Sequence, residues 1–351
     1  MFARGILAVA GLALAGLFMS SPVAAQFAPG TMLVTDAGTF QRVIAIDPAT
    51  GDRTVVSGLS RGTGTNFVAP AGIALDASGN ILVADRSQGL FSVDPVTGDR
   101  TRIASWFNGA GPGLITSEDL VALPNGDIFV ADSSYPGIIR FNPNTLEREV
   151  VSGPLFAGNL QVGEVGSGPT FNNPTGIAMD AAGNLVVTDP EIGSGNDRVM
   201  IVDPATGNRT VLSDQTGIGA GPTFAQPNGV AIAANGDLFV TDLFDDALFR
   251  IDPLTGDRAI VSDDNNGTGT SLNFPTGVAF DLGGGILVAD QAENAIFAVD
   301  PISGDRVEVS GPNVGSGPSL VDPSYLVVVP EPGSAALFAC AGLAFARRRR
   351  R

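Results

Sequence analysis

Residue types that often carry protein chemistry are missing from this chain. Its 351 residues include no histidine, and all 19 basic residues are arginine because lysine is missing as well. Without imidazole, the sequence lacks the usual general base near neutral pH, the commonest zinc ligand and every triad that uses histidine. The only cysteine is Cys340, so no disulfide can form within the chain, and the fold must be stabilised by its core alone.

Positive charge is also scarce in the body of the chain. Residues 26–330 hold 13 of the 19 basic residues but 35 of the 36 acidic ones, a net charge of about −22. Nucleic acids need clustered Arg and Lys for their phosphates, and this sequence has no basic stripe, so a nucleic acid is excluded as a partner. The 46 glycines and 24 prolines, together with 44% hydrophobic residues, indicate a turn-rich all-β body and not a disordered one.

The first 25 residues are typical of a secretory signal peptide. Arg4 precedes an apolar stretch, 6–19, that is short for a hydrocarbon core of ~30 Å. Small residues at Val23 and Ala25 suit cleavage before Gln26, and a retained N-terminal anchor is the alternative. We therefore expect an exported protein.

The C-terminal segment 330–351 combines three features in order: Pro330, Glu331 and Pro332, then an apolar segment, then five arginines. This order resembles the PEP-CTERM domain, the tail read by exosortase-type sorting systems in bacteria that export surface and matrix proteins. The apolar segment, 335–345, is shorter than is usual in that family. The resemblance implies an exosortase-type partner and a location in the cell envelope or outside the cell, with membrane anchoring before the tail is processed. A plain C-terminal membrane anchor is the alternative.

The body contains six copies of one repeat. In each copy a Gly-x-Gly pair is followed three residues later by an apolar residue, and after three more by Pro or, once, by Ser117. The second glycines are spaced 47, 57, 53, 48 and 48 residues apart. A dinucleotide-binding glycine fingerprint occurs once and opens a helix, so these pairs are interpreted as connectors between repeats.

Each repeat holds four short strands separated by turn residues, as in the strand 81–85, which predicts a four-stranded antiparallel sheet. The turn before the fourth strand reads Asp-Pro-x-Thr/Ser-Gly-Asp/Asn-Arg in five copies. The first repeat lacks its first strand, and residues 323–329 can supply it and close a ring without free edges. The sequence therefore predicts an all-β fold, a six-bladed β-propeller. The expected domains are a signal peptide 1–25, a propeller 26–329 and a sorting tail 330–351.

The repeat motif P-x-G-[IV]-A-x-D followed by G-[ND]-[IL]-x-V-[AT]-D, as in 174–189, resembles the NHL-repeat propellers and, more broadly, the gluconolactonase and senescence-marker-protein family. The resemblance covers nearly all of the body and implies the fold, not the activity. In the lactonase family, positions equivalent to Asn228 and Thr276 hold an Asn and an Asp that ligate a divalent metal, with a Glu from the blade three earlier. Asn228 fits that pattern. Thr276 stands where the pattern has Asp, and Ala71, in the blade three earlier, stands where it has Glu. The resemblance therefore does not imply hydrolase activity.

The two rims of the predicted ring differ in character. One carries the near-identical turns, and the other carries the loops between strands two and three and between blades. Divergent loops on a repeated frame are where a binding site is expected, and unconstrained surface loops are the alternative. These loops are 86–89, 133–137, 190–197, 243–247 and 291–295.

The residue after the recurring Pro or Ser is expected to line the channel mouth on the variable rim. Oxygen ligands there favour Ca²⁺ or another divalent cation, and the candidate metal ligands are Glu118, Asp119 and Asn228. The predicted ring consists of Ala71, Glu118, Thr175, Asn228, Thr276 and Ser324.

Other acidic residues receive structural interpretations. An Asp closes every second strand, and a residue repeated in each blade is expected to cap a turn by accepting backbone N–H bonds. The acidic runs 242–246 and 263–264 match no EF-hand or RTX loop and are interpreted as solvated loops.

The leading functional hypothesis is a non-enzymatic binding or scaffold propeller at the cell surface or in the matrix, with a glycan, peptide or protein as ligand. The alternative is a metal-dependent, lactonase-like hydrolase at the channel mouth, and a third option is a structural protein whose repeats serve assembly. The absence of histidine and the departures at two metal positions favour a binder over an enzyme. No catalytic residue and no organic cofactor is predicted.

Overall fold

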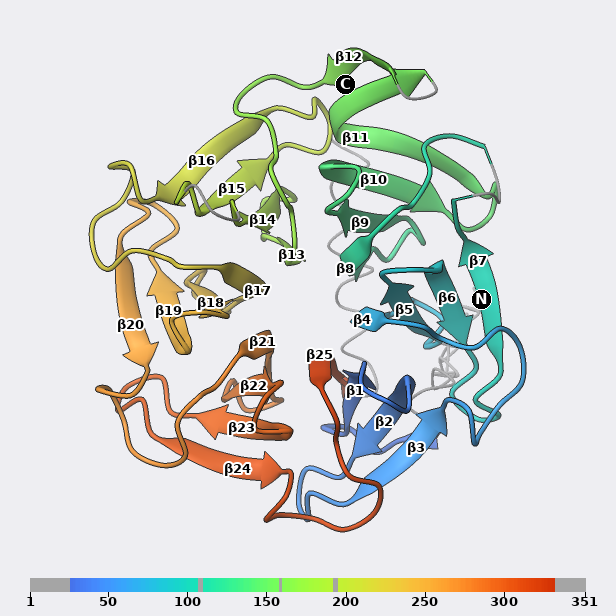
Figure 1. Cartoon of the computed structure of the whole chain (residues 1–351), viewed down its shortest axis with the longest axis vertical. Helices are drawn as coiled ribbons and strands as arrows, with labels where there is room; N and C mark the ends of the chain where they lie inside the picture. The colour runs from blue at the N-terminus through green and yellow to red at the C-terminus, as the bar shows by residue number, and fades with distance from the viewer. Residues whose placement is uncertain (1–25, 107–109, 158–159, 192–194, 332–351) are drawn as a thin grey trace, which may run out of the picture.

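The computed structural model describes residues 26–106, 110–157, 160–191 and 195–331. In these residues 25 strands form six antiparallel sheets around a central axis, so the chain is a six-bladed β-propeller, as predicted (Figure 1). The predicted signal peptide and the sorting tail from Pro332 onward lie outside the described residues. Within the described ranges, no helix has the length and apolar character needed to cross a membrane.

Each blade is given from its innermost to its outermost strand. Blade 1 consists of β25 (Pro323–Val328), β1 (Met32–Asp36), β2 (Arg42–Ile46) and β3 (Arg53–Ser57). Blade 2 consists of β4 (Pro70–Leu75), β5 (Ile81–Asp85), β6 (Gly89–Val93) and β7 (Arg100–Ala104). Blade 3 consists of β8 (Ser117–Ala122), β9 (Ile128–Asp132), β10 (Gly137–Asn142), β11 (Glu147–Ala157) and β12 (Leu160–Val165).

The remaining three blades have four strands each. Blade 4 consists of β13 (Ile177–Met179), β14 (Leu185–Asp189), β15 (Arg198–Val202) and β16 (Arg209–Asp214). Blade 5 consists of β17 (Pro227–Ile232), β18 (Leu238–Asp242), β19 (Ala247–Ile251) and β20 (Arg258–Ser262). Blade 6 consists of β21 (Pro275–Phe280), β22 (Ile286–Asp290), β23 (Ala295–Val299) and β24 (Arg306–Ser310).

The ring closes through blade 1, where the C-terminal strand β25 pairs antiparallel with β1 and places Val328 opposite Met32. This confirms the predicted closure. Blade 3 differs from the expected four strands, because β11 runs on to Ala157 and β12 pairs with its extension. The 57-residue spacing in this repeat provides the extra hairpin.

The hydrophobic core lies between the blades. It divides into six apolar clusters, each built from two adjacent blades. The apolar residue that follows each Gly-x-Gly pair is buried in one of these clusters, and Phe67 for example meets Phe91 edge to face at 5.1 Å. The six residues are Phe67, Leu114, Phe171, Phe224, Leu272 and Leu320.

Buried arginines join the outer edges of neighbouring blades. Arg306 at the start of β24 donates from Nε to the carbonyl of Thr270 (2.7 Å) and from one terminal nitrogen to Ser262 Oγ (2.6 Å) and the carbonyls of Asp263 (2.8 Å) and Asn266 (3.1 Å). Ser262 in turn donates to the carbonyl of Gly304, next to Arg306 in the turn. Because a buried guanidinium must satisfy its donors, this arrangement holds blade 6 against blade 5.

The same contact closes the ring. Arg53 of β3 donates to Ser310 Oγ (2.9 Å) and to the carbonyls of Gly311 (3.1 Å), Val314 (2.8 Å) and Pro318 (2.7 Å), so blade 1 is held against blade 6. The equivalent arginines are buried, and each is the first residue of the fourth strand of its blade, or in blade 3 the second: Arg53, Arg100, Arg148, Arg209, Arg258 and Arg306.

Replacing one of these arginines is expected to weaken the whole fold. Arg306→Ala leaves a buried hydroxyl and three carbonyls without their donor, and we expect a loss of about 3 kcal/mol or more in the free energy of unfolding, measured by urea titration. The control is Arg250→Ala, because its side chain is 53% exposed and it meets Asp237 only at 3.6 Å. Its effect should stay within about 0.5 kcal/mol. Equal effects of the two substitutions would contradict this role.

Candidate binding site at the channel mouth

The innermost strands approach one another closely, and four of the six carry glycine two residues after the recurring Pro. A Cβ at Gly176 would lie 2.3 Å from the carbonyl oxygen of Asn228 in the next blade, and one at Gly229 would lie 2.4 Å from that of Thr276. Glycine is therefore required by this close approach. The two exceptions are Asp119 in β8 and Tyr325 in β25.

Tyr325 links two blades that are not neighbours. Its hydroxyl donates to Oδ1 of Asn228 (2.9 Å), so the side chain of blade 1 reaches blade 5 past blade 6. Burial raises the pKa of Tyr325 well above its usual value, and the negative charges of Asp119 and Glu118 raise it further. The phenol therefore stays protonated and acts as a donor inside the channel.

Asp119 fastens blade 3 to blade 4. Its carboxylate accepts from the N–H of Leu120 (2.8 Å) and from that of Ile177 (3.1 Å) at the start of the short strand β13. Burial raises the pKa of Asp119 to about 7, although both backbone donors lower it. Asp119 and Tyr325 therefore form a polar cluster in the channel, at the two positions where the repeat departs from glycine.

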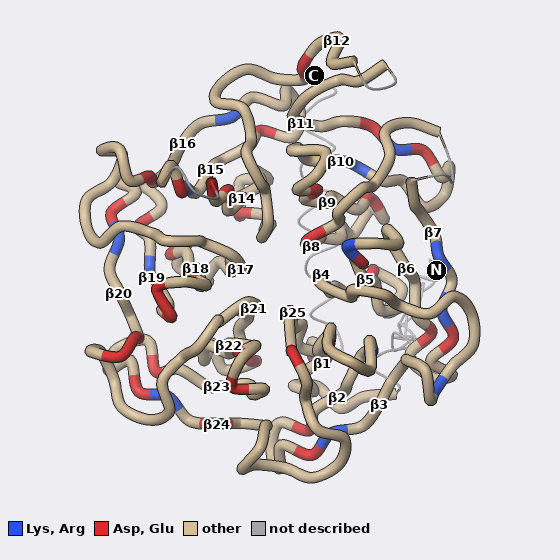
Figure 2. The backbone as a smooth tube through the Cα atoms, in the orientation of Figure 1, with Lys and Arg blue, Asp and Glu red and all other residues tan. Residues whose placement is uncertain are grey.

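Glu118 lies at the rim above this cluster. Arg86 donates from Nε to Glu118 Oε2 (2.6 Å), and Ser133 Oγ donates to Oε1 (2.8 Å). Both donors come from loops of the variable rim, and Figure 2 shows both basic and acidic stretches of backbone near β5 and β8. The arginine side chain is 29% exposed and the glutamate side chain 12%, so this ion pair is only partly exposed to solvent.

Other residues of the predicted mouth ring hold neighbouring blades. Thr276 Oγ1 donates to the carbonyl of Ser324 (2.7 Å), and Thr175 Oγ1 donates to the carbonyl of Asn228 (3.3 Å). The buried hydroxyls of Ser117 and Ser324 have no hydrogen-bond partner within the described residues.

The three predicted metal ligands are brought near the same channel, but their oxygens already have protein partners. Glu118 faces the Arg86 guanidinium, Asp119 accepts two backbone N–H bonds, and Asn228 accepts the Tyr325 hydroxyl. The described part of the chain contains no group of three or more His, Cys, Asp or Glu side chains arranged to hold a metal. A hard cation would have to compete with these protein donors for the same oxygens, and a cation at these residues stays a prediction.

The repeated aspartates at the ends of the second strands cap turns, as expected. Asp85 accepts from the N–H groups of Val68 and Ala69 with one oxygen, and from those of Ser87 and Gln88 with the other. Each of the six equivalents is buried and accepts backbone N–H bonds: Asp36, Asp85, Asp132, Asp189, Asp242 and Asp290.

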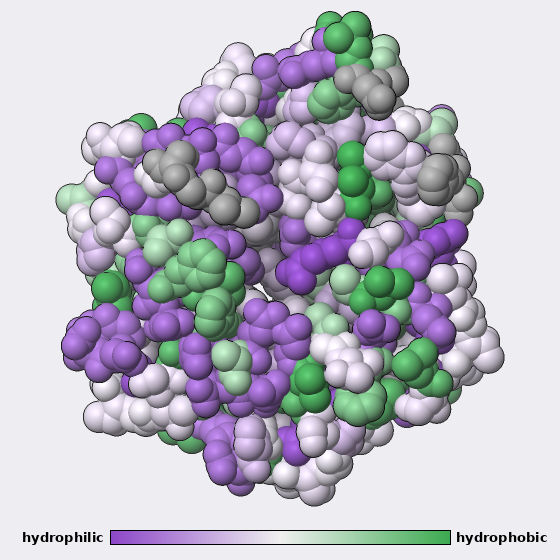
Figure 3. All heavy atoms as spheres, viewed as in Figure 1, coloured by the Kyte–Doolittle hydropathy of each residue, from purple (hydrophilic) through white to green (hydrophobic). Residues whose placement is uncertain are grey.

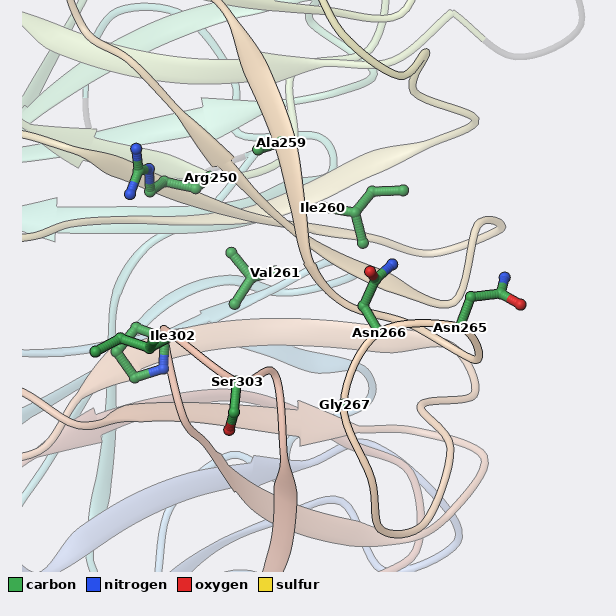
Figure 4. Close-up of a pocket in the computed structure, with 10 residues that line it drawn as sticks. Arg250, Ala259, Ile260, Val261, Asn265, Asn266, Gly267, Ile302 and Ser303 are labelled. Carbon is green, nitrogen blue, oxygen red and sulfur yellow. The ribbon is translucent and has the colours of Figure 1, made fainter.

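A separate groove of about 410 Å³ lies at the outer junction of blades 5 and 6. It runs between β20 and the turn before β24, and Arg250, Asn266 and Ile302 line it (Figure 4). None of the predicted site residues lines this groove.

Comparison with known proteins shows the fold alone. A chain in a crystal structure of a nidogen/laminin complex matches with a TM-score of 0.62 and 16% identity, over 85% of this chain and 98% of that one. A protein of unknown function from Bacteroides caccae matches with a TM-score of 0.57 and 18% identity, over 87% and 100%. A virginiamycin B lyase from Staphylococcus aureus matches with a TM-score of 0.48 and 16% identity, over 69% and 70%. The chain matches no family model. It matches none of the curated proteins either.

The bond across the channel should contribute measurably to stability. Tyr325→Phe removes the donor to a buried amide oxygen, and we expect a loss of about 1–3 kcal/mol in the free energy of unfolding. Asn228→Ala should be destabilising as well, and the double variant should lose less than the sum of the two. Urea titration of the four proteins measures this coupling. Strict additivity would show that the two side chains do not interact.

The capping aspartates should make stability depend on pH. Burial raises the pKa of Asp290 to about 7, so the folded state retains a proton that the unfolded chain releases near pH 4. The contribution of Asp290 to stability should therefore fall as the pH rises from about 4 to about 7. Compared with wild type, Asp290→Asn should show a smaller fall in unfolding free energy across this window. Parallel curves for the two proteins would contradict the raised pKa.

Proposed function

We propose that this chain is an exported, non-enzymatic binding propeller that meets its ligand with the variable rim. The proposal of export rests on the signal-peptide pattern 1–25 and on the order of motif, apolar segment and arginines after Val329. On this proposal, an exosortase-type system reads the tail, and the propeller acts at the cell surface or in the matrix. The resemblance of the repeat motif to NHL-repeat propellers supports this proposal, because the repeated frame is constant and the loops differ.

The contrast between the two rims is the observation that carries the proposal. On the uniform rim, Asp47 Oδ1 accepts from the N–H groups of Ala49 and Thr50 within its own turn, and Asp52 accepts from Ser316 of the adjoining connector. The same side chains recur in the other turns, so this rim is used for assembly of the ring. The loops of the variable rim differ from blade to blade, and one of them carries Arg86, which pairs with Glu118 of β8 at the channel mouth.

The channel itself supports binding over hydrolysis. A hydrolase needs ligands and a proton acceptor that converge on a substrate, whereas Glu118, Asp119 and Asn228 each already accept hydrogen bonds from the protein. A propeller of the same fold occurs in a complex between proteins, the nidogen/laminin complex, which is in keeping with a binding role. A surface glycan or a protein are the ligand classes that this proposal includes.

Site-specific blocking of each rim tests the proposal. In a Cys340→Ser background the chain has no cysteine, so Ser87→Cys on the variable rim or Ser303→Cys on the uniform rim can each carry a bulky maleimide–polyethylene glycol adduct. Both serines are exposed. Binding to an envelope fraction of the producing cells should fall at least about tenfold with the adduct at position 87 and stay unchanged with the adduct at position 303. Loss of binding from position 303 alone would contradict the assignment of the rim.

A further inference from the structure

Two exposed phenyl rings lie together on the variable rim between blades 5 and 6. Phe244 belongs to the loop between β18 and β19, and Phe274 directly precedes β21. Their centroids are 5.9 Å apart at 88°, and the side chains are 59% and 39% exposed. Figure 3 views this rim and shows apolar surface beside the channel opening over these blades. We call Phe244, Phe274, Asp245 and Asp246 the rim patch.

The rim patch is held in place by its own backbone. Phe274 has a φ of +59° and Asp246 one of +49°, in the left-handed region that bulky residues avoid. Asp246 Oδ1 accepts from the N–H of Phe274 (2.8 Å), so the loop of blade 5 fixes the connector that leads into blade 6. Neither ring belongs to one of the apolar clusters between the blades.

In the part of the chain that the structure describes, no arginine forms an ion pair with the carboxylates of the rim patch. Asp245 is exposed, and its carboxylate forms no hydrogen bond or ion pair within the described residues. Partial burial raises the pKa of Asp245 to about 6, and the negative charges of Asp242, Asp246 and Asp263 raise it further. The free protein therefore gathers like charges beside two aromatic faces.

The corresponding loop of blade 1 has an arginine next to its exposed phenyl ring. Phe40 is exposed in the corresponding loop between β1 and β2, and the guanidinium of Arg42 lies over its ring at 4.5 Å. Arg42 Nε also donates to Asp36 Oδ2 (2.8 Å), the aspartate that closes β1. This chain thus already contains one arginine that binds a phenyl ring and an aspartate at once.

Register shows which blades carry an arginine opposite the capping aspartate: blades 1 and 4 do, whereas blades 2, 3, 5 and 6 carry glycine or alanine there. Arg42 lies opposite Asp36 in blade 1, and Arg198 lies opposite Asp189 in blade 4, where it also forms an ion pair. In blade 5 the residue opposite Asp242 is Ala247. Blade 5 therefore has the aromatic ring and additional carboxylates of such a site but no arginine of its own.

We propose that the rim patch binds an arginine side chain of a partner protein. The aromatic faces attract a cation through their quadrupole, and the Asp245 carboxylate supplies a negative charge that no arginine of this loop neutralises. The arginine would take the role that Arg42 has in blade 1. This inference rests on the proposed binding function of the variable rim and names its partner's chemistry.

Other occupants fit less well. A second copy of the chain is disfavoured, because each copy carries a net charge of about −22 over residues 26–330 and like charges repel. A divalent cation needs several oxygen ligands, which phenyl rings do not supply. A free small cation would stay half in water on this open rim, where a cation–π contact is weak, whereas a partner's surface would cover the rings and strengthen it.

The test uses the full-length protein and a short peptide that alternates arginine with glycine and serine. Its matched probe replaces each arginine with citrulline, which keeps the shape and removes the charge. Calorimetry should show that the arginine peptide binds and that its affinity declines with added salt. The citrulline peptide should bind at least about tenfold more weakly. Equal binding of the two peptides, or binding only of a neutral oligosaccharide, would overturn the proposal.

Variants connect this binding to the rim patch. Phe244→Ala and Asp245→Asn should each weaken the arginine peptide about tenfold, whereas Phe40→Ala, whose ring is already covered by Arg42, should leave it unchanged. Ala247→Arg should abolish binding, because it supplies an arginine within the chain at the position that Arg42 occupies in blade 1. Ala247 is buried, so Ala247→Arg can fail to fold. In that case Asp245→Asn, which changes an exposed side chain, still tests the proposal.

The two proposals fail in different ways. If the adduct at position 87 blocks envelope binding but Asp245→Asn and Phe244→Ala leave both envelope and peptide binding intact, the variable rim is the binding face and the arginine inference is wrong. If neither adduct affects envelope binding and the arginine peptide does not bind, both fall.

Discussion

Six buried arginines hold the blades of this ring together, and the rest of the molecule depends on them. Each lies at or next to the start of the fourth strand of its blade and donates to acceptors of the preceding blade or connector, as Arg306 does to the Ser262 hydroxyl and three carbonyls. A chain without disulfides can close a ring in this way, because each contact satisfies a buried cation and fixes the spacing between two apolar clusters. In each contact, the arginine that follows the repeated turn binds the Gly-x-Gly connector of the preceding blade. The rim that carries the turns therefore serves to hold the ring together.

Function is left to positions where the repeat is broken. In the channel, Asp119 and Tyr325 replace glycines that the close approach of the strands otherwise requires, and they tie together blades 3 and 4 and blades 1 and 5. On the variable rim, the loop of blade 5 carries Phe244 and Asp245. Like blades 2, 3 and 6, blade 5 has no arginine opposite its capping aspartate, whereas blades 1 and 4 have one. Both departures change charge and hydrogen bonding at one place without altering the frame, which is how a repeat protein can gain a site at small cost to its stability.

Prediction from the sequence succeeded where a feature was repeated. Six copies of one pattern predicted the blades, the strand 323–329 predicted closure, and the recurring aspartates were correctly interpreted as caps. The single features were harder. The fifth strand of blade 3 was missed although its repeat is the longest, and Tyr325 was missed although it interrupts the glycine pattern. Glu118, Asp119 and Asn228 were predicted as metal ligands from their place at the channel mouth, and that stays a prediction; their hydrogen bonds to Arg86, Ile177 and Tyr325, which lie far away in sequence, were not predicted.

The sequence by itself determined the number of blades, their order and the way the ring closes, because these follow from local periodicity and from turn residues that act within a few positions of one another. Only the tertiary structure decided which polar side chains meet, since that depends on where the ring brings residues of different blades. The pairing of Tyr325 with Asn228 across 97 residues has no local signature. The meeting of Phe244 with Phe274 likewise arises from two loops that curvature alone makes neighbours.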